Sequence, residues 1–251
     1  MRHGLPHQAL RTTLIAVCLA IAVSSVNGQQ RKEATSANRY KWSILPYTGF
    51  ATYSLSGVRD YQSYLLAETT LPLTATTKFP AFVIFGADLE YRFDNVYIQI
   101  GWQHGSTAGR LWYSDYSGTI RLDQLYRYNA IAFTIGRKIN KSAKLEIFAG
   151  LRSSLIFNRL KVDNKAVFTG VDVSESAEFA AKSFGVQPHL RFVLHMNNSI
   201  YFNASAGYEL QKTVELEKSD DKNVFLADQN NDPVTVNGSG LRFTIGCGFL
   251  F

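Results

Sequence analysis

Hydrophobic and polar positions alternate with a period of two over most of the chain after about residue 40. One stretch places Val83, Phe85, Ala87, Leu89 and Tyr91 at every second position, with mainly polar or small residues between the later ones. Successive side chains of a β-strand face opposite sides, so this pattern predicts strands with one apolar and one polar face. Beyond the N-terminal region we find no convincing helical period.

Turn residues divide the alternating segments into eight predicted strands, near residues 41–54, 80–93, 96–113, 123–138, 144–160, 183–196, 199–214 and 240–251. Three connections are short and rich in Asn or Asp, which tolerate the positive φ of tight hairpins: residues 94–95, 140–142 and 197–198. Four connections are long and polar: residues 55–78, 114–122, 162–181 and 216–238. Long and short connections alternate strictly along the chain.

This order of connections predicts an all-β fold: a single closed antiparallel up-and-down transmembrane β-barrel of about eight strands, with long extracellular loops and short periplasmic turns. The alternative is a soluble lipocalin-like barrel with an apolar interior. Glycines on the polar face favour the membrane barrel, because a narrow, crowded lumen needs small residues: Gly86, Gly101, Gly150, Gly207, Gly246 and Gly248. Pro46 leaves the faces of the first strand ambiguous, and a bulge or an edge-like position would explain it.

The polar face of the predicted strands also carries charges of both signs. We expect these residues to form a polar network in the lumen: Asp88, Glu90, Arg92, Glu146, Arg152, His189, Arg191, Glu209 and Arg242. Charges removed from water need partners, so most of them should point inward and pair with one another. The apolar face, in contrast, carries almost no charge over a depth that would cross a bilayer.

The first 28 residues differ from the rest of the chain. Arg2 and Arg11 precede an apolar run at residues 14–23 (LIAVCLAIAV), and small residues follow to Gly28. This order predicts a secretory signal peptide at residues 1–28, with cleavage after Ser25 as the alternative. The run is shorter than the roughly 20 residues of a membrane-spanning helix. Cys18 lies inside the run, with more apolar sequence beyond it, which disfavours a lipoprotein.

The remaining chain divides into a polar, flexible lead-in at residues 29–39 and a barrel at residues 40–251. Removal of the signal peptide takes away Arg2 and Arg11 and no acidic residue, so the net charge falls from +6 to +4. That charge is too small and too dispersed to indicate nucleic acid as a partner. Cys247 is then the one remaining cysteine, so an internal disulfide is excluded.

The last residues, 244–251 (TIGCGFLF), resemble the assembly signal at the end of outer-membrane β-barrels. The residues that match are Thr244, Gly246, Phe249 and Phe251. The mature chain as a whole resembles the outer membrane protein β-barrel domain family, whose members are small eight-stranded barrels. This resemblance implies the outer membrane of a Gram-negative bacterium, contact with outer-membrane lipid and lipopolysaccharide, and biogenesis through periplasmic chaperones and the barrel-assembly machinery. We expect no periplasmic domain after the barrel, unlike in relatives that tether to the cell wall.

The stretch at residues 103–109 (QHGSTAG) is similar to the His-x-Ser-Asn-Ala signature of outer-membrane lipid A deacylases. That resemblance implies Ser106 as nucleophile and His104 as base. Thr107 stands where the family has Asn, the motif falls on the third predicted strand rather than late in the barrel, and no carboxylate on the lipid face is placed to orient His104. We therefore predict no catalytic residue and interpret His104 and Ser106 as polar residues that lie near the membrane interface.

Eight strands enclose an interior that side chains fill, so an open pore is not expected. No spacing of His and Cys indicates a metal, and no glycine loop indicates a phosphate cofactor, so neither is predicted. The predicted function is that of a non-enzymatic integral outer-membrane barrel that binds a protein partner, or scaffolds the envelope, through its extracellular loops. The alternatives are a lipid A deacylase-like hydrolase and, by analogy of fold, an accessory barrel of an outer-membrane secretion system.

Overall fold

The computed structural model describes residues 40–68, 73–142, 144–168, 171–221, 223–228 and 230–251. All of them lie in the compact unit Arg39–Phe251. The predicted signal peptide and lead-in fall outside the described residues.

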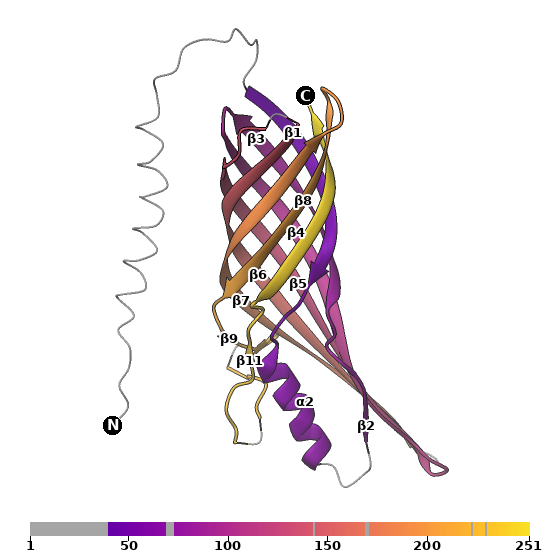
Figure 1. The fold of residues 1–251 in the computed structure, drawn as a ribbon. Helices are drawn as coiled ribbons and strands as arrows, with labels where there is room; N and C mark the ends of the chain where they lie inside the picture. Colours follow the sequence, from indigo (N-terminus) through magenta and orange to yellow (C-terminus); the bar gives the residue numbers. More distant parts are fainter. Residues whose placement is uncertain (1–39, 69–72, 143, 169–170, 222, 229) are drawn as a thin grey trace, which may run out of the picture. The chain divides into compact units, whose positions relative to one another are not determined.

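Eight antiparallel strands form a closed ring (Figure 1): β1 (Tyr40–Ala51), β3 (Phe82–Phe93), β4 (Val96–Ser114), β5 (Gly118–Lys138), β6 (Leu145–Phe168), β7 (Val171–His195), β8 (Ile200–Gln211) and β12 (Gly240–Leu250). Strands β3 to β7 each pair with the next along the chain, the last of these pairs being β7 with β8. β1 pairs with β3 and β12, and β12 pairs with β8, which closes the ring. The all-β, eight-stranded, up-and-down barrel predicted from the sequence is confirmed.

The short connections lie where the sequence predicts them, at the end of the barrel that holds the C-terminus (Figure 1). Asp94 takes a positive φ of 46° in the turn between β3 and β4. In the turn between β7 and β8, the Asn197 side chain accepts hydrogen bonds from the backbone N–H groups of Ser199 and Ile200, both at 2.8 Å. Asn and Asp therefore close these hairpins by the two properties typical of turn residues: they tolerate positive φ, and their side chains accept hydrogen bonds from the backbone of the turn.

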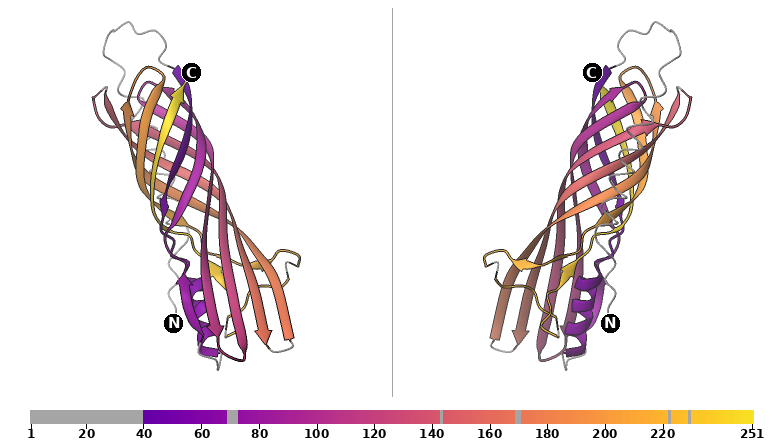
Figure 2. Two further views of the ribbon diagram at one scale, coloured as in Figure 1. Left: turned by 90° about the vertical axis from the view of Figure 1, so that its right-hand side faces the viewer. Right: turned by 90° about the vertical axis from the view of Figure 1, so that its left-hand side faces the viewer.

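Three strands are longer than predicted. The structure continues β5 back to Gly118, β6 on to Phe168 and β7 back to Val171, so most of the expected loops at residues 114–122 and 162–181 are strand. Figure 2 shows β4 to β7 extending well past β8 and β12 at the long-connection end. The prediction missed these extensions because both faces of the sheet are solvated there, and apolar–polar alternation disappears although the backbone still pairs.

The first long connection contains a helix that the sequence analysis did not predict, α2 (Ser56–Glu68), followed by β2 (Thr74–Lys78), which pairs with β4. Val58 and Gln62, one helical turn apart, are both buried. Because a polar Gln occupies one of these positions, the helical period is weak in the sequence. The last long connection holds three two-residue strands: β9 (Val214–Glu215), β10 (Glu217–Lys218) and β11 (Thr235–Val236).

Pro46 does not disturb the pairing of β1. Ile44 pairs with Phe249 and Tyr47 with Gly246, so the register with β12 is the same on both sides of the proline and no bulge is present. Ser43, Leu45 and Tyr47 face the lumen, whereas Pro46 faces outward. The expected bulge or edge-like position was therefore wrong: the proline lies in a ring strand and its missing N–H interrupts the ladder without shifting it.

The outer face of the barrel is apolar. Large hydrophobic side chains stand exposed on it, among them Ile100 (57%), Phe133 (52%), Leu155 (49%) and Ile245 (53%). Alternate residues on the same strands are buried inside. An apolar exterior around a polar interior fits a bilayer and is the reverse of a soluble barrel, and in hydrocarbon a β-structure must be closed, as this one is. No helix in the described part of the chain is long and apolar enough to cross a membrane.

A charge placed on this outer face should destabilise the barrel. We expect Ile100→Arg to lower the free energy of unfolding by about 2–4 kcal/mol in lipid vesicles, because a cation near the bilayer midplane is poorly solvated. Urea titration followed by heat-modifiable gel mobility measures the loss. The control is Asp172→Arg, in the solvated extension of β7. Equal stability of the Ile100→Arg variant and the parent would show that water, not lipid, covers this face.

Candidate functional site

The lumen contains layers of paired charges, and the first layer surrounds Glu90 of β3. Arg92 donates to Glu90 Oε1 at 2.6 Å, and Gln99 of β4 donates to Oε2 at 2.8 Å. Arg191 of β7 forms an ion pair with the same carboxylate. Tyr201 donates its hydroxyl to Glu90 Oε1 at 3.2 Å. Ser43 of β1 donates its hydroxyl to the same oxygen at 3.4 Å. Glu90 is completely buried, so this layer replaces its water shell with five donors from five strands.

Glu146 of β6 forms a second group near the short-turn end. Its carboxylate accepts hydrogen bonds from Arg92 at 3.0 Å and from Lys138 at 2.8 Å. His195 Nε2 lies 3.0 Å from the same carboxylate. Arg92 therefore joins the groups around Glu90 and Glu146 into one network.

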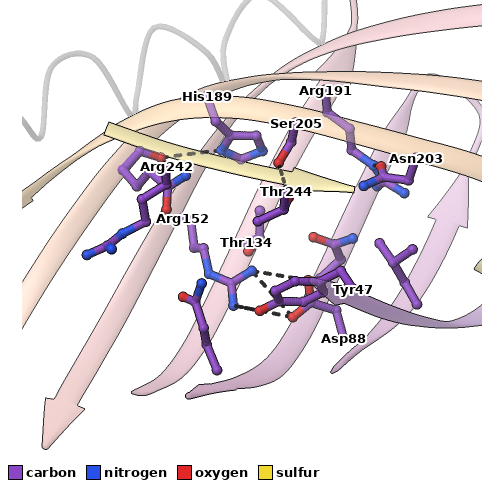
Figure 3. Close-up of a pocket in the computed structure, with 14 residues that line it drawn as sticks. Tyr47, Asp88, Thr134, Arg152, His189, Arg191, Asn203, Ser205, Arg242 and Thr244 are labelled. Carbon is purple, nitrogen blue, oxygen red and sulfur yellow. Dashed lines mark hydrogen bonds and ion pairs between the residues drawn. The ribbon is translucent and has the colours of Figure 1, made fainter. Parts of the chain in front are cut away.

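The middle layer is formed by Arg152 of β6 and Asp88 of β3 (Figure 3). Arg152 Nη1 donates to Asp88 Oδ2 at 3.1 Å, and Nη2 donates to the Tyr47 hydroxyl at 3.0 Å. His189 lies nearby, with Nε2 at 2.7 Å from the Tyr97 hydroxyl. The space left between these side chains is a cavity of about 40 Å³. It has room for a few water molecules.

Arg242 of β12 and Glu209 of β8 form the layer nearest the long connections. They are joined by an ion pair, and both are buried. The Arg242 guanidinium carbon lies 4.3 Å from the ring centroid of Tyr53 and 5.4 Å from that of Tyr128. Cation–π contacts of this kind stabilise a desolvated guanidinium.

The structure thus places all nine charged or His residues of the predicted network in the lumen and brings most of them into pairs. The sequence analysis did not include the aromatic and amide side chains that complete each layer: Tyr47, Tyr53, Tyr97, Gln99, Tyr128 and Tyr201. Their positions carried a signal, since Tyr47, Tyr97, Gln99, Tyr128 and Tyr201 fall on the inward face of their strands and Tyr53 continues the inward row of β1 two residues beyond its end. A tyrosine counts as apolar in an alternation pattern, which concealed its role as a hydrogen-bond donor.

An apolar cluster fills the barrel mouth beyond Arg242. Leu55 and Val58 enter it from the first long connection, Ile156 from β6, and Leu216 and Val236 from the last long connection; all five are fully buried. Tyr61 of α2 is partly buried and packs against the same cluster. Buried ion pairs and this cluster therefore occupy the lumen from the Glu90 layer to the barrel mouth.

His104 and Ser106 lie on the outer face of β4. His104 packs between Phe85 and Trp102, with ring centroids 5.0 and 6.1 Å away. Its Nδ1 lies 2.8 Å from Oδ1 of Asn129 on β5. The sequence analysis looked for an orienting carboxylate and missed this amide. Between His104 and Ser106 themselves, both described, no hydrogen bond is formed.

The residues of the predicted assembly signal lie along β12 and its end. Phe249 and Phe251 are exposed on the outer side. Thr244 faces the lumen and shares a 2.6 Å hydrogen bond with Ser205 (Figure 3). Gly246 lies against Tyr47. Among the residues that the structure describes, no cluster of His, Cys, Asp and Glu is suited to a metal ion.

No protein-family model and no curated protein matches the chain. Several solved membrane barrels are similar in fold. Neisserial surface protein A is 9% identical over 86% of this chain and 100% of that chain, with a TM-score of 0.37. Ail, the attachment invasion locus protein of Yersinia pestis, is 12% identical over 86% and 100%, with a TM-score of 0.33. The outer-membrane protease OmpT from Escherichia coli is 9% identical over 87% and 99%, with a TM-score of 0.25. Because these scores are low, the barrel assignment rests on the strand pairing of the chain itself.

Proposed function

We propose that the chain is an outer-membrane barrel of a Gram-negative bacterium that acts without catalysis, by presenting its projecting sheet to a protein partner at the cell surface. The observation that carries this proposal is a contrast between the two parts of the barrel. The lumen is filled along its length, whereas β5, β6 and β7 continue far beyond the apolar outer face.

The lengths of the strands support the proposal. A membrane-spanning strand needs about 9–11 residues. β6 has 24 residues and β7 has 25. On β7 the side chains at residues 172–176 are exposed on both faces, as expected for a sheet surrounded by water. Regular pairing with β6 keeps this segment in register to the tip, so the barrel holds it as a rigid surface.

The tip between β4 and β5 is also ordered by its own side chains. Asp115 accepts hydrogen bonds from the hydroxyls of Ser117 and Tyr113, each at 2.6 Å. These two contacts, that of Ser117 first, lower the pKa of Asp115 to about 2. The carboxylate of the turn is therefore ionised at neutral pH, and these contacts order the turn without a partner.

A crosslinking experiment in intact cells tests the proposal. A photoreactive amino acid is placed at Asn164 or at Ser174, on neighbouring strands of the projecting sheet. We expect discrete protein adducts from both positions and lipid adducts alone from the control position Leu155. Ion conductance of the purified barrel in planar bilayers should stay at the background level. Steady conductance, or an absence of protein adducts at both sheet positions, would contradict the proposal.

A lipid A deacylase-like hydrolase remains the second candidate, and the contact between His104 and Asn129 favours it. An amide at Nδ1 can hold an imidazole so that Nε2 faces a nucleophile. The separation of His104 and Ser106 argues against it. We expect lipid A from cells that express the parent or Ser106→Ala to give the same mass spectrum. An acyl chain missing with the parent alone would establish the hydrolase and make Ser106 and His104 catalytic.

A further inference from the structure

Four neighbouring strands carry a cation at the border of the apolar outer face. Moving outward from the short turns, the first charged outward-facing residue beyond the apolar stretch is Arg127 on β5, Arg159 on β6, Lys182 on β7 and Lys212 directly after β8. On the side of each cation that faces the short turns, the outward positions are apolar or uncharged; on β7, for example, Phe184 is the outward residue next to Lys182. The four side chains form what we call the cationic arc.

Pairing of the strands places the arc residues next to one another. Arg127 is the direct cross-strand partner of Arg159. Arg159 is opposite Ala180, two residues from Lys182 on the same face of β7. The backbone N–H of Lys212 donates to the carbonyl of Phe184 at 2.9 Å. Like charges directly opposite on a sheet repel each other, so this arrangement is unfavourable unless an anion lies between them.

The barrel itself supplies little negative charge to the arc. Glu178 lies 3.4 Å from Arg159, but both side chains are well exposed, at 43% and 63%. In the described structure Arg127, Lys182 and Lys212 have no ion pair. A groove of about 1110 Å³ runs beside the arc, and all four cations line it, together with Phe157, Asn129 and other side chains. Five Lys or Arg side chains and two Glu side chains line this groove, so its net charge is positive.

The arc is confined to one side of the barrel. On β4 the residue opposite Arg127 is the uncharged Ser106, and the outward positions of β1, β3 and β12 carry no charge. A general collar of cations around the barrel would not leave half of the circumference uncharged. Confinement to four consecutive strands indicates a bound group of defined size.

We propose that the cationic arc and its groove bind the phosphate-bearing headgroup of a lipid in the adjacent leaflet. Phosphate oxygens would accept hydrogen bonds from Arg127, Arg159, Lys182 and Lys212, since guanidinium and ammonium groups are the usual phosphate ligands. The acyl chains would lie on the apolar face directly below, along Leu155 and Phe184. This inference concerns the membrane-facing wall and is independent of the projecting sheet.

Native mass spectrometry of the folded barrel in detergent micelles tests the site with three probes: phosphorylated lipid A, the same lipid without its phosphates, and sodium phosphate. We expect the parent to retain phosphorylated lipid A preferentially. Each cation near a charged membrane surface contributes about a fivefold change in affinity, so Arg127→Gln with Arg159→Gln should weaken binding about 25-fold. Arg127→Lys with Arg159→Lys keeps the charges and should retain most of it.

The control is Lys141→Gln with Lys144→Gln, two exposed lysines at the opposite end of the barrel. It should bind like the parent, and heat-modifiable mobility should show that every variant is folded. Equal retention of the lipid with and without phosphate would overturn the proposal, and so would an equal loss of binding in the control. Displacement of the lipid by millimolar sodium phosphate would indicate a site for a small free anion and would also overturn it.

Discussion

Replacing Arg191 with Met is expected to lower the free energy of unfolding by about 3 kcal/mol, near the lower end of the usual cost of breaking a buried ion pair. Arg191 is 2% exposed and Glu90 is fully buried. The substitution removes the charged partner of Glu90 Oε2, leaving Gln99 as its donor, and deprives Asn203 of the guanidinium that it contacts. Arg92 still pairs with Glu90 Oε1, which limits the loss.

Urea titration of the barrel in lipid vesicles, followed by tryptophan fluorescence, measures this effect. Lys165→Met is the control, because Lys165 is exposed on the solvated extension of β6, outside the cationic arc, and its loss should cost little. Adding Glu90→Gln to Arg191→Met should recover part of the stability, since the uncompensated carboxylate is then neutral. A loss below 0.5 kcal/mol for Arg191→Met would mean that water reaches Glu90 and that the lumen is not filled.

The sequence predicts the structure of a strand well only where the two faces of the strand meet different surroundings. Within the bilayer each strand separates lipid from a polar lumen, so alternation specifies which residues face inward. Gly248 illustrates this: a Cβ there would lie 1.9 Å from the Tyr201 ring, so the position needs glycine, and the glycine content of the polar face predicted a crowded lumen. Arg242 and Glu209 were assigned inward on the same basis.

Beyond the bilayer both faces of a strand meet water, so apolar and polar residues no longer alternate and the strand cannot be recognised from the sequence. Lys165 of β6 and Ser174 of β7 pair in a regular ladder, yet both faces there meet water and the sequence reads as a polar loop. Helix α2 was missed for a related reason: its buried face includes Gln62, and tertiary contacts with the barrel mouth stabilise it more than its own periodicity does. Asn129 could not be assigned to His104, because cross-strand register between β4 and β5 follows from turn geometry and not from residue type.

Truncation of Ile156 tests the apolar seal at the barrel mouth. Ile156 is fully buried among Leu55, Leu160 and Val236. We expect Ile156→Ala to lower the free energy of unfolding by about 2–5 kcal/mol, because the rigid wall of a barrel cannot collapse into the space that the side chain leaves. The measurement is the urea titration used for Arg191.

Leu155 provides the matched control, since it precedes Ile156 on β6 and faces the opposite side, where it is 49% exposed to lipid. Leu155→Ala loses transfer free energy of about 2 kcal/mol for three carbons but leaves no cavity, because lipid fills the space. Comparing the stability losses of the two variants therefore distinguishes a tightly packed barrel mouth from one that is open to water. If the mouth were open to water, Ile156→Ala would remove an apolar side chain from water, and the free energy of unfolding would stay the same or rise. Leu155→Ala would still lower the free energy of unfolding by about 2 kcal/mol. A large loss at Ile156 together with background conductance in the same variant would mean that the ion-pair layers below the cluster keep the lumen closed on their own.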